Sequence, residues 1–272
     1  MVLHPKFPYN TVWLTNLAIK AAISAGTKIN EVYSSSDFNI KIKDDNTPVT
    51  VADHLAHAEI VDKLQASGLP VLSEEGIHLS YSERKSWELF WLVDPLDGTK
   101  EFIKRNDEFT VNIALIQNDK PISGVIYAPV SGELYAGIPE LGAFRLVNPA
   151  EDCSFEMMQT SGVKLPEPIT KNEFVIAISR SHTNPETEAY IETLRNEHPL
   201  VRIVNKGSSL KICMVAEGTA DVYPKIGKTM EWDTAAGHAI VLAAGKNIIC
   251  PDTNKELIYN KEELRNPNFI VQ

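Results

Sequence analysis

Apolar residues in the N-terminal part of the chain recur at helical spacing. Between Thr11 and about Ser34 they lie three and four positions apart, and the same spacing returns between about Ala52 and Ser67. Because this period places apolar side chains on one face of a helix, we predict two amphipathic helices, the first with Thr11 as its candidate cap. The polar, turn-rich segment IKIKDDNTPVTVAD, which starts at Ile40, connects them.

Strand patterns follow the second helix. The segment LPVLSEEG predicts a short strand that runs into a loop at Gly76, and the continuous apolar run at 89–93 is typical of a strand covered on both faces. The stretch 109–138 alternates between apolar and polar residues and is broken by NDKP and PVSG, so we expect an antiparallel meander. The segment 142–147 predicts a further strand.

The pattern changes near residues 150–172, which are irregular and rich in Pro and Glu. Beyond this stretch, strand patterns alternate with helix patterns, which favours an α/β arrangement. We expect strands at 174–179, 201–205 and 220–224, and helices at 185–198, 208–218 and 232–245. We therefore divide the chain into an N-terminal α+β half, residues 1–155, and a C-terminal α/β half, residues 156–272.

Composition and net charge limit the binding partners and the cellular compartment that we expect for the protein. The 272 residues carry a formal net charge of −10, which argues against a nucleic acid polymer as a partner because phosphate backbones require a basic face. Three widely separated cysteines give neither a zinc motif nor a disulfide framework and fit a reducing cytoplasm. No apolar stretch approaches the ~20 residues of a membrane span. We expect a cytoplasmic protein without a secretory signal, and the sequence leaves open both a peripheral contact with the inner membrane and the oligomeric state.

Six acidic residues lie at the ends of predicted elements: Asp53, Glu74, Glu75, Asp94, Asp97 and Asp233. Each has an ordinary explanation when it is taken alone. Asp53 and Asp233 are placed to stabilise helix N-termini. Asp97 with the following glycine is typical of a hairpin turn, and the two glutamates suit a solvated loop. Taken together, the six indicate a site, because ligands gather at the carboxyl ends of strands in open α/β sheets.

Converging carboxylates require protons or cations. Two carboxylates ~4 Å apart repel by about 4 kcal/mol at an effective dielectric constant of about 20, and several such pairs would rival the stability of a domain. Divalent cations relieve this repulsion, and an all-oxygen ligand set favours Mg²⁺, Mn²⁺ or Ca²⁺ over zinc or copper. The neighbouring turn adds an anion site, because Gly98 lets the backbone approach a ligand, and Thr99 and Lys100 would open a helix whose N–H groups bind phosphate.

Three separated motifs contain five of these six acids, all except Asp53. DPLDGT at 94–99 is preceded by SEE at 73–75 and followed by EWDTAAG at 231–237. In this order they resemble the signatures of the inositol monophosphatase-like, lithium-sensitive, Mg²⁺-dependent phosphatases, and the resemblance extends from about Lys43 to Gly245.

Finer details resemble one branch of that family. DGTKEF stands where inositol monophosphatases typically have DGTTNF, and KGSSLK at 206–211 and YPK at 223–225 resemble the 3'(2'),5'-bisphosphate nucleotidases. Lys228 departs from the proline expected before the last motif, which alters a loop and leaves the predicted metal ligands untouched.

The resemblance implies both a fold and a reaction. The fold would be a layered α/β/α/β/α sandwich with the acids between its two halves. The reaction would be hydrolysis of the 3'-phosphate of adenosine 3',5'-bisphosphate, a by-product of sulfate assimilation, to AMP and phosphate by two-metal activation of water. Two alternatives stay open: an inositol- or sugar-phosphate phosphatase on the same scaffold, and a non-catalytic protein that binds divalent cations.

The resemblance also implies the site residues. Two or three Mg²⁺ ions would be held by Glu74, Asp94, the carbonyl of Leu96, Asp97 and Asp233. Thr99 and Asp53, with Glu74, would carry out catalysis by orienting the attacking water and taking its proton. The substrate contacts would be Glu74, Leu96, Asp97, Gly98, Thr99, Asp233, His182, Ser208, Ser209 and Lys211. For the last three, the alternative is an ordinary helix start with a solvated lysine.

Overall fold

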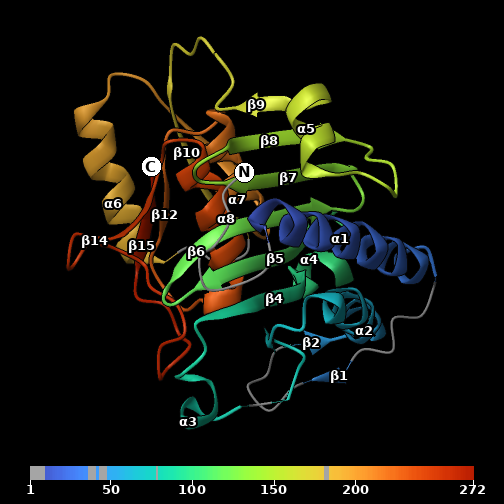
Figure 1. The fold of residues 1–272 in the computed structure, drawn as a ribbon. Coiled ribbons are helices and arrows are strands. Elements are labelled where there is room, and N and C mark those ends of the chain that lie inside the picture. The colour runs from blue at the N-terminus through green and yellow to red at the C-terminus, as the bar shows by residue number, and fades with distance from the viewer. Residues whose placement is uncertain (1–9, 36–40, 43–47, 78, 181–183) are drawn as a thin grey trace.

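A seven-stranded sheet forms the centre of the molecule, with strand order β3-β4-β5-β6-β7-β8-β9 (Figure 1). The structure is a computed structural model and describes residues 10–35, 41–42, 48–77, 79–180 and 184–272. The strands of this sheet are β3 Val71–Ser73, β4 Leu89–Asp97, β5 Thr110–Gln117, β6 Lys120–Ala128, β7 Glu133–Ile138, β8 Gly142–Val147 and β9 Val163–Leu165. β3 and β4 are parallel and the remaining pairs are antiparallel, so the predicted meander is confirmed.

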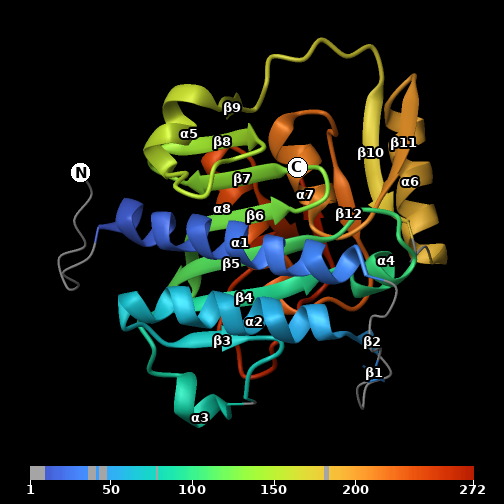
Figure 2. The same ribbon diagram turned by 90° about the vertical axis from the view of Figure 1, so that its right-hand side faces the viewer.

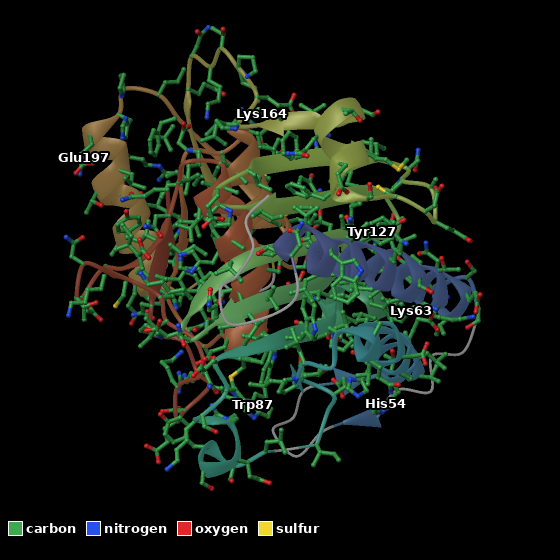
Figure 3. All side chains as sticks on the ribbon, viewed as in Figure 1. His54, Lys63, Trp87, Tyr127, Lys164 and Glu197 are labelled. Atoms are coloured by element: carbon green, nitrogen blue, oxygen red, sulfur yellow. The ribbon has the colours of Figure 1, made fainter. Side chains whose placement is uncertain are left out.

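Two long helices cover one face of this sheet (Figure 2). They are α1 Thr11–Tyr33 and α2 Val51–Leu64, and the 3₁₀ helix η1 Gln65–Ser67 continues the second. Both predicted helices are confirmed, but the predicted cap is wrong: the Asn10 side chain accepts the hydrogen bond from the Val12 N–H, at 2.9 Å. Tyr127 of β6 lies against α1 at Gly26, where any side chain would overlap its ring (Figure 3).

The connector before α2 contains the paired two-residue strands β1 Lys41–Ile42 and β2 Pro48–Val49. Short helices α3 Tyr81–Arg84, α4 Thr99–Ile103 and α5 Phe155–Ser161 complete the first part of the chain.

The other face of the sheet is covered by α7 Leu210–Glu217 and α8 Glu231–Ala243. Glycines in the sheet let α8 approach closely. A Cβ atom added to Gly124 of β6 would lie 2.8 Å from the Ala236 carbonyl carbon, and one on Gly137 of β7 would lie 2.8 Å from the Ile240 Cα. Real Cβ atoms do not approach backbone atoms this closely, so the position of α8 depends on these glycines.

A second β layer and an outer helix lie beyond α7 and α8 (Figures 1 and 2). The layer contains a parallel pair and a four-stranded sheet of order β12-β15-β13-β14, joined by the bridge between Ile176 and Val222. Its elements are β10 Phe174–Ser179, β11 Val201–Lys206, β12 Tyr223–Lys225, β13 Ile248–Cys250, β14 Lys255–Glu256 and β15 Phe269–Val271, with α6 Pro185–Glu197 outside. Separate apolar clusters fill the spaces between successive layers. The predicted α/β/α/β/α sandwich is confirmed.

The chain crosses between layers after the first sheet is complete. α5 begins at Phe155, where we place the boundary between the halves, and β9 then adds the last strand of the first sheet. The division into two halves stays a prediction. Among the described residues, no helix is both long and apolar enough to cross a membrane.

Candidate active site

Strand β4 carries three of the predicted ligands at its carboxyl end: the Asp94 and Asp97 carboxylates and the Leu96 carbonyl. The apolar run 89–93 is a buried strand as predicted, but the strand continues to Asp97 instead of ending at a turn. Asp94 pairs with Asn112 and Asp97 with Thr110, so a bulge at Pro95 and Leu96 separates the two acids. The hairpin alternative for Asp97 and the next glycine is therefore wrong.

The residue after this strand requires glycine. Gly98 has φ of 97°, a left-handed conformation that residues with side chains rarely adopt, and it starts α4. A Cβ atom there would also lie 3.1 Å from the Glu108 carbonyl oxygen and 3.3 Å from the Ser208 Cβ. The predicted helix start at Thr99 is confirmed.

Three carboxylates converge next to the bulge. Glu74, Asp94 and Asp233 each offer an oxygen, and these oxygens lie within 4.8 Å of one another. Asp94 is only 1% exposed, and one of its oxygens accepts the Leu96 N–H at 3.1 Å. Burial, together with the charges of neighbouring acids, raises the pKa values of Asp94 and Asp233. Since like charges gather in a buried place, the cluster favours a divalent cation.

Asp97 lies beside this cluster. The Ser209 hydroxyl donates to its carboxylate at 2.6 Å, and the Asn112 side-chain amide approaches it at 3.5 Å. Burial raises the pKa of Asp97, and the hydrogen bond from Ser209 opposes the shift. The charge of Asp97 raises the pKa values of both Asp94 and Asp233, so it shares their electrostatic environment.

Asp53 combines a structural contact with a contact to the site. It is the third residue of α2, and one carboxylate oxygen accepts from the Thr50 N–H and hydroxyl, both at 2.7 Å. The other oxygen lies 3.2 Å from the Thr99 hydroxyl, which is also 3.3 Å from the Leu96 carbonyl oxygen. Burial raises the pKa of Asp53. The predicted stabilisation of the helix start is therefore present at Asp53, and its catalytic role stays a prediction. Asp233 likewise stabilises a helix start, because it accepts the Met230 N–H at 2.8 Å.

A cleft of about 1340 Å³ opens above the acids. Eight predicted site residues line it: Glu74, Asp97, Gly98, Thr99, Ser208, Ser209, Lys211 and Asp233. Asp53, Asp94 and Leu96 are not part of its lining. His182 lies outside the described residues. His54 of α2 also lines the cleft (Figure 3).

Basic residues that are not among the predicted site residues also line the cleft: Lys100, Arg180, Lys206, Lys225, Lys228 and Arg265. Burial lowers the pKa of Lys225, and the charges of Asp233 and Asp97 oppose that shift, so its ammonium group lies near both carboxylates. The sequence signals for Lys206 and Lys225 were the KGSSLK and YPK motifs, whereas Arg180 and Arg265 have no local pattern that distinguishes them from surface residues. Carboxylates that can hold metal ions, with lysines and arginines around them, suit the binding of a phosphate ester through those metal ions.

Lys211 supports the loop between β11 and α7 from beneath. Its buried ammonium group donates to the carbonyl oxygens of Ser208 at 2.6 Å and Lys206 at 3.1 Å, and it lies 5.3 Å from the centre of the Tyr223 ring. Burial lowers the pKa of Lys211 to about 8. The solvated lysine considered as an alternative is therefore wrong, and Ser208 above it has a left-handed backbone with φ of 47°.

A layered fold with an acidic cluster at a cleft that lysines and arginines also line is the arrangement expected of a metal-dependent phosphatase. The chain belongs to the inositol monophosphatase family, whose model matches residues 12–269. The resemblance predicted from the sequence is thus confirmed.

Relatives and solved structures agree with this assignment. The 3'(2'),5'-bisphosphate nucleotidase CysQ of Shigella flexneri is 45% identical over 255 residues, which cover 92% of this chain and 96% of that protein. The CysQ of Escherichia coli K12 is 44% identical over the same shares. The crystal structure of CysQ from Bacteroides thetaiotaomicron is similar over 97% of this chain and 98% of that one, with 48% identity and a TM-score of 0.89. SuhB from Bartonella henselae, at 25% identity, gives a TM-score of 0.73 over 95% of this chain and 93% of its own.

Proposed function

We propose that this protein hydrolyses the 3'-phosphate of adenosine 3',5'-bisphosphate to AMP and phosphate. The observation that carries the proposal is the carboxylate cluster of Glu74, Asp94 and Asp233 at a cleft that lysines and arginines also line. A bisphosphate nucleotide needs both parts, because one phosphate reacts at the metal site and the other must be neutralised nearby. The names of the CysQ relatives support the same substrate.

Magnesium is the metal that the proposal assigns to the cluster. All of the donors are oxygens, and three of them lie within 4.8 Å of one another, on the buried Asp94 and the half-buried Glu74 and Asp233. This gathering of negative charge creates a need for positive charge that Mg²⁺ meets. Two or three ions would be held by Glu74, Asp94, Asp97, Asp233 and the Leu96 carbonyl. A bound divalent cation supplies Lewis-acid activation of water and of phosphoryl oxygens.

Thr99 and Asp53 would orient the attacking water. The Thr99 hydroxyl lies 3.2 Å from the Asp53 carboxylate, and when it donates there its lone pairs stay free to accept a proton from a water in the cleft. The raised pKa of Asp53, caused by burial, suits it to take that proton through Thr99. Glu74, which lines the cleft next to the reacting phosphate, would complete the group.

The nucleotide would bind against the loop that contains Ser208 and Ser209, next to Gly98, with His182 as the proposed contact of the base. The Ser209 hydroxyl is held by hydrogen bonds with the Asp97 carboxylate at 2.6 Å and the Asn112 amide at 2.7 Å. Ser209 would therefore link the bound nucleotide to the metal site.

The three cysteines are free and buried, as suits a reducing compartment, and we place the enzyme in the cytoplasm as part of this proposal.

A substrate panel tests the function. We expect phosphate release from adenosine 3',5'-bisphosphate, in the presence of Mg²⁺, to be at least about tenfold more efficient in kcat/KM than release from inositol 1-phosphate or fructose 1,6-bisphosphate. A preference for either of the latter substrates would favour the sugar- or inositol-phosphate alternative. Metal binding without phosphate release from any of the three would favour the non-catalytic alternative.

Lys211→Ala should affect nucleotide substrates selectively. Because the ammonium group holds the Ser208 and Lys206 carbonyls through charged hydrogen bonds, its loss should raise KM for adenosine 3',5'-bisphosphate about tenfold. Steady-state kinetics with a simple phosphate monoester should change much less. Lys171→Ala is the matched control, since Lys171 pairs with Asp221 outside the cleft. Equal losses on both substrates would mean that Lys211 does not act on the nucleotide.

A further inference from the structure

The Glu108 carboxylate joins three chain segments at the edge of the cleft. Glu108 lies between α4 and β5 and is 8% exposed. Its oxygens accept two hydrogen bonds from the Arg180 guanidinium, each at 2.8 Å, and one from the Gly207 N–H at 2.8 Å. The Lys206 ammonium group lies 3.5 Å away. The segment 206–209, which follows β11, is therefore attached to the half of the molecule that holds most of the carboxylates.

Close backbone packing makes this attachment specific. A Cβ atom on Gly207 would lie 2.7 Å from the Glu108 carbonyl oxygen and 2.9 Å from the Glu108 Cβ. The absence of a side chain at Gly207 thus lets its N–H reach the carboxylate. Ser208, the next residue, lies against Gly98 and has a left-handed backbone. The segment must be held in this conformation from outside, because a residue with a side chain does not favour it.

The attachments of the segment include contacts to three different side chains. Ser209 is bonded to Asp97 at the metal site, Lys211 holds the Ser208 carbonyl from below, and Glu108 holds the Gly207 N–H from the side. The Glu108 contact does not involve a predicted metal ligand. It therefore affects the position of the segment without removing charge from the carboxylate cluster.

We propose that Glu108 is a positioning residue that sets the affinity for the nucleotide by fixing the 206–209 segment against the catalytic half. This inference rests on the proposed function, in which that segment binds the nucleotide. Without the carboxylate, the Gly207 N–H and the Arg180 guanidinium lose their shared acceptor. The contacts of Ser209 and Lys211 remain, but the substrate then has to complete the ordering of the segment at the time of binding. That ordering reduces affinity and leaves the chemical step largely unchanged.

Kinetics with two substrates test the inference. For Glu108→Ala we expect KM for adenosine 3',5'-bisphosphate to rise about tenfold while kcat changes less than about threefold. With p-nitrophenyl phosphate, which lacks a nucleoside, both constants should stay within about threefold of wild type. Glu108→Gln keeps one acceptor oxygen and should give an intermediate KM. Glu173→Ala is the matched control, because Glu173 pairs with Arg202 at the opposite end of the same two strands, and it should behave as wild type.

A second measurement separates failure of this inference from failure of the proposed function. Amide hydrogen exchange over residues 206–209 should be faster in Glu108→Ala than in wild type or in Glu173→Ala, whatever the substrate is. If wild type does not hydrolyse the bisphosphate, the proposed function is wrong, and the exchange result decides on the positioning role alone. An unchanged KM in an active enzyme, parallel losses on both substrates, or unchanged exchange would each overturn the role of Glu108.

Discussion

Asp94→Asn should abolish Mg²⁺-dependent phosphate release while the protein stays folded. Asp94 is at the centre of the carboxylate cluster, and asparagine keeps the oxygen that accepts the Leu96 N–H. The substitution removes the negative charge on which the cations depend. Because bound metal contributes several kcal/mol to the transition state, kcat/KM should fall at least about 10³-fold. Phosphate release measured over a range of Mg²⁺ concentrations checks this expectation.

The same substitution should raise thermal stability although it abolishes activity. Without divalent cations, Asp94→Asn should be more stable than wild type, since it removes a carboxylate whose pKa is raised first by burial and then by repulsion from the neighbouring acids. Addition of Mg²⁺ should raise the Tm of wild type more than that of the variant. Asp221→Asn, at a residue that pairs with Lys171 and does not line the cleft, is the control. Wild-type turnover in Asp94→Asn would remove the basis for the metal site.

Gly124→Ala should have the largest effect on stability. The added methyl group would lie 2.8 Å from the Ala236 carbonyl carbon, so α8 has to move away from the sheet. Overpacking against a backbone costs about 3 kcal/mol, which corresponds to a decrease in Tm of at least about 6 °C. Because α8 carries Asp233 one turn before Ala236, the folded fraction should also lose activity at low Mg²⁺ concentration. Differential scanning calorimetry and kinetics on the same samples measure both effects.

Gly245→Ala is the matched comparison for this substitution. Gly245 follows α8, has φ of 75°, and has no atom within 4 Å of an added Cβ. Its replacement should cost about 1 kcal/mol through backbone strain and leave the activity of the folded protein unchanged. If the two variants lose the same stability and keep the same activity, close packing of α8 does not position Asp233.

Length limits which parts of the fold a periodic pattern reveals, although the three-residue strand β3 and part of β12 were predicted from their apolar runs. The helices α1 and α2 and the strands β5 to β7 extend over enough residues for their periods to appear in the sequence. The strands β13, β14 and β15 have only two or three residues, so no period could reveal them, and they were missed. Strand β4 was predicted too short, because Pro95 and Leu96 interrupt the pattern while pairing resumes at Asp97 beyond the bulge.

The candidate site was predictable where residues follow strands or open helices. Glu74, Asp94 and Asp97 were expected at one edge of the sheet, and the structure brings Glu74 and Asp94 together with Asp233. Glu108 was missed because its sequence neighbourhood is that of an ordinary charged loop, and its partners Arg180 and Gly207 are distant in the sequence. Because these contacts form only when distant segments of the chain fold together, the sequence around Glu108 contains no pattern that predicts them.

The central place of α8 has a consequence for biosynthesis. All seven strands of the first sheet have been synthesised once translation reaches Leu165. Helix α8, which covers much of the second face of that sheet, is complete only at Ala243. At about 5–20 residues per second, that apolar face stays open for several seconds while the nascent chain grows. We therefore expect the newly made N-terminal segment to depend on chaperones, and the native layers to assemble only after α8 has been synthesised.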